Sequence, residues 1–160
     1  MKSTLYLKFI ILYIIFGFLS IFTVAALTSG LTYNPLEKRI SSSLYQEANT
    51  VASDYLPAYF SEQISLNGVR TQLNGMASYL NAAVWFVDPD GTMITSAQSD
   101  SFPASPYSVA DFNPAETADD QYITGDYHGY FEQDVMTVIT PVIQSYTPQG
   151  YLIIHKNLDD

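Results

Sequence analysis

The sequence predicts an α+β fold: a five-stranded antiparallel sheet with a long N-terminal helix, preceded by one transmembrane helix. Three observations support this. A charge-free apolar run lies near the N-terminus, apolar residues recur at helical spacing between residues 36 and 80, and short stretches rich in β-formers follow from residue 82. Because the helical patterns precede the strands instead of alternating with them, the helices are expected to cover one face of the sheet.

The first element is a membrane-spanning helix. Residues 9–27, FIILYIIFGFLSIFTVAAL, carry no charge, and as a helix they rise roughly 28 Å, close to the hydrocarbon thickness of a bilayer. A cleaved signal peptide is the alternative, because Val24-Ala25-Ala26 is a passable cleavage site. The run is longer than a usual signal-peptide core, which favours an uncleaved anchor.

The flanking charges orient this span. Lys2 and Lys8 precede it, so residues 1–8 are predicted to be cytoplasmic and residues 9–30 to be the transmembrane helix. Two basic residues just beyond the span weaken this assignment without reversing it. With either an anchor or a cleaved signal, the remainder of the chain is exported.

Beyond the span the chain is strongly acidic. Residues 28–160 contain all sixteen acidic residues and only four basic ones, a formal charge of −12. Because phosphate binding needs a basic face, no nucleic-acid partner is expected. The absence of cysteine excludes disulfides and thiolate metal sites.

A stalk helix is predicted next, within residues 31–62. Gly30 and Pro35, in TSGLTYNP, predict a break after the span, and Pro57 should bend or end the new helix. Between these points, apolar residues step by three and four along one stripe: Leu36, Ile40, Leu44, Ala48, Val51 and Tyr55. The stripe can pack on the domain's own sheet or form a homodimer seam, and both remain open on different faces.

A second helix and a hairpin follow. Val69, Leu73, Met76 and Leu80 again have helical spacing. The period then changes: AAVWFV at 82–87 predicts a buried strand, DPDG a tight turn, and Thr92 to Ala97 the returning strand.

The C-terminal half alternates between an irregular excursion and strands. Residues 98–122 have weak periodicity, with one short helix expected at Asn113-Pro114. Strands are predicted at His128–Phe131, at Val135–Ile143, where Pro141 indicates an edge or a bulge, and, after the turn YTPQG, at Tyr151–His155. Short connections among these three imply antiparallel pairing.

This order of parts resembles a known family. AVWFVDPDGTMITSA is similar to the first hairpin of extracytoplasmic PAS-like (single Cache) sensor domains of bacterial membrane-bound sensor histidine kinases. VMTVITPVI and GYLIIHKNL are similar to their closing strand pair, and ITG at 123–125, followed by YHGYF, sits where such domains re-enter the sheet. Residues 63–160 would then be the remainder of the sensor domain.

The resemblance implies a function and a place. It implies the anchor and extracytoplasmic sensing domain of a two-component sensor histidine kinase in the cell membrane, with a second span and the kinase core expected beyond Asp160. The same module occurs on chemoreceptors and cyclic-dinucleotide enzymes. A membrane-tethered surface binding module without a signalling role also remains open.

Catalytic chemistry is not expected of this chain. The hydrolase, zinc-protease and nucleotide-binding motifs are missing, so no catalytic residue, metal or cofactor is assigned. His128 and Glu132 lie four apart on a predicted strand, which does not bring them together as zinc ligands. His155, at a strand end, is expected to face solvent.

A ligand pocket between the sheet and the excursion is the remaining candidate site. The residues placed there by position are aromatic side chains and possible polar anchors: Trp85, Tyr107, Tyr122, Tyr127 and Tyr130, with Arg70, Asp126 or His128. Arg70 could neutralise an anionic ligand or pair with a carboxylate, and the aromatics could simply fill the core. The unknown ligand is a small molecule or a cation; in the second case divalent ions would bridge anionic lipid and an acidic stretch, Asp111, Glu116, Asp119, Asp120 and Asp126.

Overall fold

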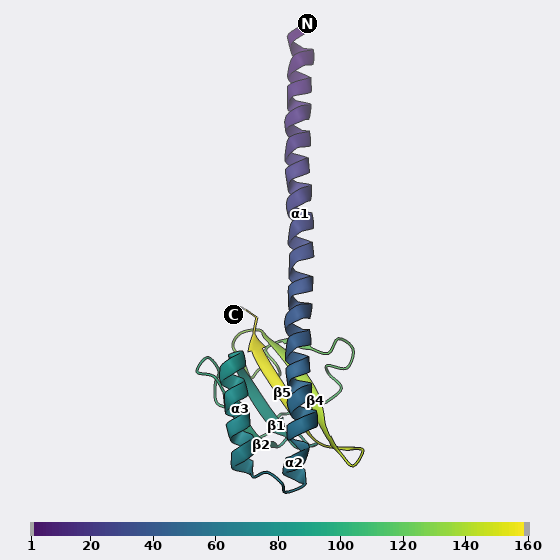
Figure 1. Cartoon of the computed structure of the whole chain (residues 1–160). Helices are drawn as coiled ribbons and strands as arrows, with labels where there is room; N and C mark the ends of the chain where they lie inside the picture. The colour runs from purple at the N-terminus through teal and green to yellow at the C-terminus, as the bar shows by residue number, and fades with distance from the viewer. Residues whose placement is uncertain (1, 159–160) are drawn as a thin grey trace. The chain divides into compact units, whose positions relative to one another are not determined.

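The computed structural model of the chain describes residues 2–158, with side chains described for residues 6–24 and 36–158. It divides into two compact units, Met1–Ile40 and Ser41–Asp160. The boundary between them falls inside helix α1, Lys2–Thr50 (Figure 1). In the described residues the first unit is helical throughout, and the second holds the sheet.

The first unit contains the predicted membrane span. Tyr6–Val24 is long and apolar enough, by length and composition, to cross a membrane, and it is the one such stretch among the described residues. Its apolar side chains are exposed, as expected of a helix whose partner is lipid. The predicted break at residues 28–35 is wrong, because α1 continues through Pro35. The proline ring fixes φ near a helical value, so the interruption is limited to a lost hydrogen bond and local crowding.

The second unit is built on a five-stranded antiparallel sheet with the strand order β2-β1-β5-β4-β3. The strands are β1 Ala82–Val87, β2 Met93–Gln98, β3 Ile123–Gly125, β4 Val135–Gln144 and β5 Thr147–Asn157. The predicted fold class is confirmed. Pro141 lies on β4 beyond the three residues that pair with β3, and a bulge follows at Val142/Ile143, so both predictions for this proline hold.

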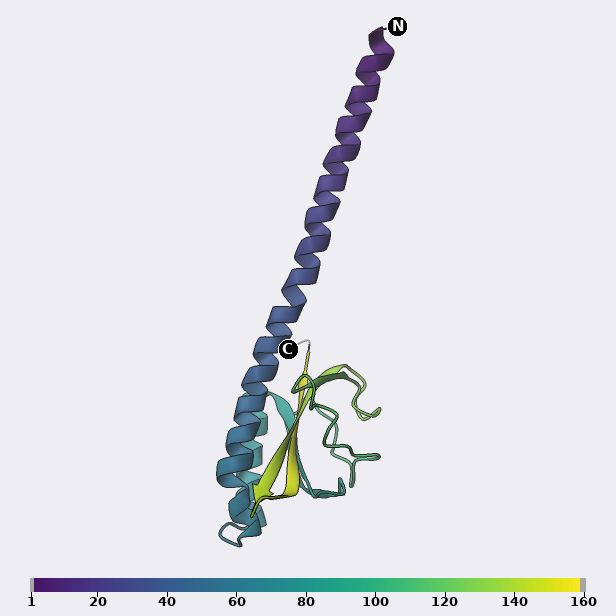
Figure 2. The same ribbon diagram turned by 90° about the vertical axis from the view of Figure 1, so that its right-hand side faces the viewer.

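The two faces of the sheet have different covers. The helices lie on one face and the excursion between β2 and β3 lies on the other (Figure 2). Strand β1 is buried on both sides. Phe86 packs edge-on against Tyr59 and Phe60 on the helical face, whereas Trp85 belongs to the core cluster under the excursion.

The helical face is formed by three segments. The last turns of α1 lead into a π-helical turn, Val51–Tyr55, then α2 Pro57–Phe60 and α3 Leu66–Leu80. Pro57 has no N–H to continue the α-helical ladder, and the Leu56 N–H instead bonds the Val51 carbonyl at 3.0 Å. Leu44, Ala48 and Val51 are buried, so this part of the stripe packs within its own domain. The homodimer seam stays a prediction.

The β1–β2 turn is held by its first aspartate. The Oδ1 atom of Asp88 accepts hydrogen bonds from the N–H groups of Asp90 and Thr92, both at 2.9 Å. Gly91 takes the left-handed conformation, with φ of 83°. A Cβ atom at Gly91 would lie 2.6 Å from the Cβ of Phe112, so this turn needs glycine both for its backbone and for its contact with the excursion.

Three local predictions are wrong. The third strand is Ile123–Gly125 and not 128–131, because Tyr127, His128 and Gly129 have φ of 41°, 57° and 76° and form a turn. Left-handed residues cannot extend a strand.

The other two errors concern loops. Residues 114–120 form successive turns instead of a helix, although Asn113 Oδ1 accepts from the Ala115 N–H at 3.1 Å as a cap would. The β4–β5 turn is Ser145-Tyr146, with φ of 51° and 65°, so β5 begins at Thr147, inside the predicted turn YTPQG.

Two glycine-to-alanine substitutions should change stability in opposite directions. Gly91→Ala places a side chain at positive φ and against Phe112, and should lower the free energy of unfolding by at least about 1–2 kcal/mol. Gly75→Ala is the matched control, since Gly75 is exposed in α3 with open space around it, and should raise that energy by roughly 0.5–1 kcal/mol. Urea unfolding of the full chain in detergent, followed by circular dichroism, measures both. Equal effects of the two changes would contradict the assigned turn.

Candidate functional site

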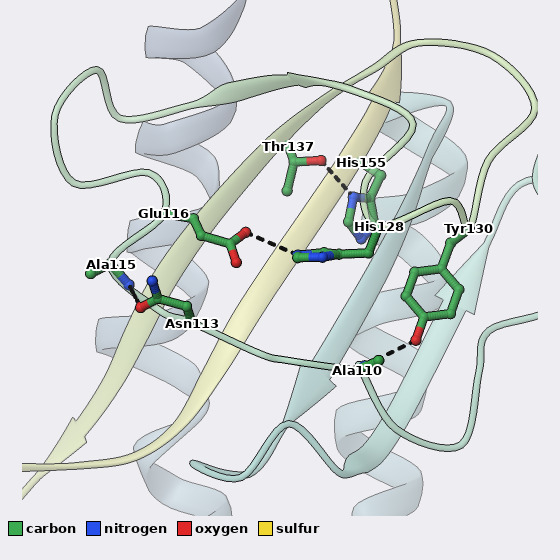
Figure 3. Close-up of polar contacts among 8 residues, drawn as sticks. All are labelled: Ala110, Asn113, Ala115, Glu116, His128, Tyr130, Thr137 and His155. Carbon is green, nitrogen blue, oxygen red and sulfur yellow. Dashed lines mark hydrogen bonds and ion pairs between the residues drawn. The ribbon is translucent and has the colours of Figure 1, made fainter.

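The candidate site begins with a buried histidine on β5. His155 is fully buried, and its Nδ1 lies 2.8 Å from the Oγ1 of Thr137, its cross-strand partner on β4 (Figure 3). Burial lowers the pKa of His155 to about 3, so the ring is neutral at physiological pH. The prediction that His155 faces solvent is wrong. β5 is a central strand, between β1 and β4, and the side of the sheet that carries His155 is covered by Tyr127 and Phe131.

An aromatic cluster surrounds His155. Its ring centroid lies 4.3 Å from that of Trp85, 4.6 Å from that of Tyr127 and 4.8 Å from that of Phe131. Trp85 comes from β1, while Tyr127 and Phe131 come from the segment between β3 and β4. This segment folds back because the Phe131 N–H bonds the Asp126 carbonyl at 3.1 Å.

Tyr130 ties that turn to the excursion. Its hydroxyl donates to the Ser108 carbonyl at 3.1 Å and accepts from the Ala110 N–H at 3.0 Å. Its ring packs edge-on against Trp85. Two segments of irregular backbone are thereby held together over the sheet, and Figure 3 shows Tyr130 reaching Ala110 from the turn.

Three buried polar atoms in the cluster have no hydrogen-bond partner among the described residues. They are Trp85 Nε1, the Tyr127 hydroxyl and His155 Nε2, and their rings contact one another. A buried polar group left without a partner costs about 1–3 kcal/mol. Buried polar groups in native proteins are almost always hydrogen-bonded, so three such atoms in one cluster call for a further partner.

A histidine–carboxylate contact lies above this cluster. His128 Nε2 is 3.1 Å from Glu116 Oε2, and both side chains remain partly exposed, 29% and 20% respectively. The pair joins the excursion to the turn that carries Tyr127 (Figure 3). Burial, the nearby Glu116 carboxylate and Tyr130 raise the pKa of Tyr127, so its hydroxyl stays protonated.

Two cavities flank the turn. The smaller, about 190 Å³, is lined by Glu116, Ile123, Thr124, Gly125, Asp126, Tyr127, His128 and Thr137. The larger, about 440 Å³, is lined by Ser101, Phe102, Pro103, Tyr130, Phe131, Glu132, Gln133 and Asn157. The smaller one connects the Glu116–His128 pair at its rim with Thr137, the partner of His155.

The structure brings together five of the eight site residues that the sequence predicted: Trp85, Asp126, Tyr127, His128 and Tyr130. It places three elsewhere. Arg70 is exposed on α3, with its Nε donating to Thr95 Oγ1 at 3.4 Å on the helical face. Tyr107 is 84% exposed, and Tyr122, half-buried, lines neither cavity.

Sequence reasoning did not single out His155, Thr137 or Phe131, and it named Glu116 only within the acidic stretch. For His155 a signal existed. YLIIH is a continuous apolar run, which is typical of a strand buried on both faces. The Glu116–His128 pair had no such signal, because it depends on the path of two loops.

The excursion face is acidic. Residues 99–134 hold eight acidic residues and neither lysine nor arginine. Within Ser41–Leu158 the lysines and arginines are Arg70, on the helical face, and Lys156, whose Nζ donates to the Leu80 carbonyl of α3 at 2.8 Å. No group of three or more potential metal-ligating side chains is found among the described residues.

Comparison with known proteins establishes the fold. No protein-family model matches the sequence, and no curated protein matches it. Among solved structures, the ligand-binding domain of Mlp24 with asparagine has a TM-score of 0.52 at 12% identity, covering 86% of this chain and 57% of that one. The predicted PAS-like architecture is therefore confirmed at the level of fold.

Two further solved structures are similar. The sensor domain of the V. cholerae histidine kinase DctB has a TM-score of 0.49 at 18% identity, covering 82% of this chain and 57% of that one. The ligand-binding domain of the Pseudomonas fluorescens chemoreceptor CtaA, in complex with L-isoleucine, has a TM-score of 0.31 at 15% identity, covering 81% and 61%. The chain spans less than two thirds of the length of each of these neighbours.

His155 should make stability depend on pH. Its pKa is about 3 in the folded protein and about 6.5 when unfolded, so the unfolded state binds more protons between these values. The free energy of unfolding should therefore fall as pH drops below about 6.5, with a limiting slope of about 1.4 kcal/mol per pH unit. Urea unfolding of the full chain in detergent at pH 7.5, 6.5 and 5.5 measures this.

The His155→Gln variant should have a flatter pH dependence than the wild type. Thr137→Val is the matched control, since it removes the hydroxyl beside Nδ1 but keeps the histidine; it should be less stable with the slope retained. Parallel pH profiles for the wild type and His155→Gln would refute the assignment of a neutral buried histidine.

Proposed function

We propose that the chain is the membrane anchor and ligand-sensing module of a bacterial transmembrane signalling protein, and that its ligand binds in the cavity beneath the Glu116–His128 pair. The observation that carries the proposal is the set of unpaired buried polar atoms on Trp85, Tyr127 and His155. Of these three residues, Tyr127 lines that cavity, and Trp85 and His155 lie behind it in contact with the Tyr127 ring. A ligand that supplied hydrogen bonds there would remove an energetic cost that the unliganded site carries.

The proposed topology follows the charges and the span. Residues 1–8 are cytoplasmic, 9–30 cross the membrane, 31–62 form the stalk and 63–160 the remainder of the sensor, which lies outside the cytoplasm. Support comes from the exposed apolar stretch Tyr6–Val24 and from the acidic composition beyond it. The module binds and does not catalyse, in keeping with the lack of catalytic motifs in the sequence.

The proposed signal leaves the site along β5. Figures 1 and 2 show that β5 ends at the same end of the sheet at which α1 enters this unit. His155, in contact with Tyr127 and Phe131, lies two residues before the end of β5. A ligand that moves the 126–131 turn therefore acts directly on the strand that exits beside α1.

Coupling of binding to signalling requires that the ligand binds two arrangements of the 126–131 turn and β5 with unequal affinity. A difference of roughly 1–3 kcal/mol is typical, and the cost of one or two unpaired polar groups is of this size. In a homodimer with paired stalks, the displacement of β5 would change the positions of the two stalk helices relative to each other. The exposed Leu36 on α1 is available for such a seam.

The parent protein is proposed to be a sensor histidine kinase, on the resemblance of the hairpin and the closing strands. If the parent protein is instead a chemoreceptor or a cyclic-dinucleotide enzyme, the same sensing module is joined to a different cytoplasmic part. All of them require the ligand site, so the first test concerns binding.

Thermal-shift screening of the full chain in lipid nanodiscs, against small molecules, should find a compound that raises the melting temperature. A ligand present at one hundred times its Kd stabilises the fold by about 2.7 kcal/mol. The same compound should change the emission of Trp85, the single tryptophan, because Trp85 contacts Tyr127 and His155.

Tyr127→Phe should weaken binding of that compound, because it removes one hydroxyl and keeps the ring. Tyr107→Phe is the matched control, since Tyr107 is 84% exposed and its variant should bind like the wild type. If no compound shifts the melting temperature, or if both variants bind equally well, the proposed site is incorrect.

A further inference from the structure

We infer that the cavity beneath Glu116 selects a small organic ammonium compound, and that the His128 side chain is an internal competitor that such a ligand displaces. This rests on the proposed function and specifies its ligand class. Two features point to the ligand independently: the charges at the cavity and the unpaired, buried hydroxyl of Tyr127, a residue that lines it.

The charges at the cavity favour a cation. Glu116 and Asp126 line it, and the lysine and arginine of this unit, Arg70 and Lys156, are engaged on the helical face. A ligand carboxylate would therefore meet two carboxylates, with the lysine and arginine of this unit on the other face of the sheet.

The buried hydroxyl can serve an N–H donor once the His128 ring is displaced. Tyr127 is 4% exposed, and its oxygen can accept one bond from an ammonium group while Glu116 accepts another. At about 190 Å³ the cavity is smaller than the roughly 300–1,000 Å³ of sites for drug-sized ligands, so the compound is small.

A metal cation is disfavoured by ligand number. Divalent ions take six or more oxygen ligands, several of them from protein carboxylates. Among the described residues no group of three or more His, Cys, Asp or Glu side chains comes close enough to hold one. An ammonium group needs only two or three acceptors, which this rim provides.

His128 occupies the place of the ligand's cationic group. Its Nε2 lies 3.1 Å from Glu116, and its ring stands 4.8 Å from that of Tyr127. The chain holds it there through two consecutive left-handed residues, Tyr127 and His128, a conformation that costs energy in residues other than glycine. Because the pair is partly exposed, it contributes little, and a better donor can replace it.

The test uses the full chain in nanodiscs of zwitterionic phosphatidylcholine at pH 7, with 1,4-diaminobutane and ethylammonium as cationic probes and succinate as the anionic one. Binding is followed by Trp85 fluorescence and by isothermal titration calorimetry. An amine should bind and succinate should not. Glu116→Gln should weaken amine binding about tenfold or more, because a charge-assisted bond is lost. Glu132→Gln, in the other cavity, is the matched control and should leave it unchanged.

His128→Asn separates competition from a structural role. Asparagine tolerates the left-handed backbone, so the turn is kept while the competing ring is removed, and amine binding should tighten by about threefold. Unchanged or weaker binding in this variant would overturn the competitor role. Magnesium chloride, added as a third probe, should neither bind nor displace the amine.

The outcomes also distinguish this inference from the proposed function. A library compound that is anionic or neutral, and that needs Tyr127, would leave the sensor proposal standing and overturn the ammonium class. Amine binding that responds equally to Glu116→Gln and Glu132→Gln would be general attraction to an acidic surface, and would also overturn it.

Discussion

The placement of β5 between β1 and β4 is the constraint on which the rest of the structure depends. β1 pairs with it over its whole length, and β4 pairs with it from Val135 to Gln144. Because both faces of the sheet are covered, the side chains of β5 from Leu152 to His155 are all buried. His155 is the one polar side chain in its buried stretch, and it becomes the point around which the aromatic cluster assembles.

Much of this sheet was predictable because its signals are local. Ala82–Val87 and Val135–Ile143 are runs of β-formers, and the Asp88–Gly91 turn has its own chemistry. The position of His155 was predicted wrongly because the predicted strand ended there, whereas β5 continues to Asn157 and the continuous apolar run YLIIH is typical of a strand buried on both faces. The strand predicted at residues 128–131 is wrong because no local pattern in YHGYF predicts two left-handed residues before the glycine.

The candidate site was harder to predict because it is made by loops. Trp85 and Tyr127 could be proposed from their residue types, but Glu116 meets His128 only through the turns after Asn113 and after Gly125. Arg70 was proposed because it is a rare positive charge in an acidic unit. Helix α3 covers the opposite face of the sheet, so charge scarcity indicated the wrong side of the molecule.

The two faces of the sheet differ in their polar groups. Three of the unpaired buried atoms, those of Trp85, Tyr127 and His155, cluster on the excursion face, where the consecutive left-handed residues Tyr127 and His128 and the partly exposed Glu116–His128 contact also lie. Segments with such features are drawn from the less stable part of a fold, and they are the ones a small ligand can rearrange. His155 accepts or donates a hydrogen bond with Thr137 of β4 and contacts Tyr127 and Phe131 of the segment between β3 and β4. It therefore links that segment directly to the two central strands of the sheet.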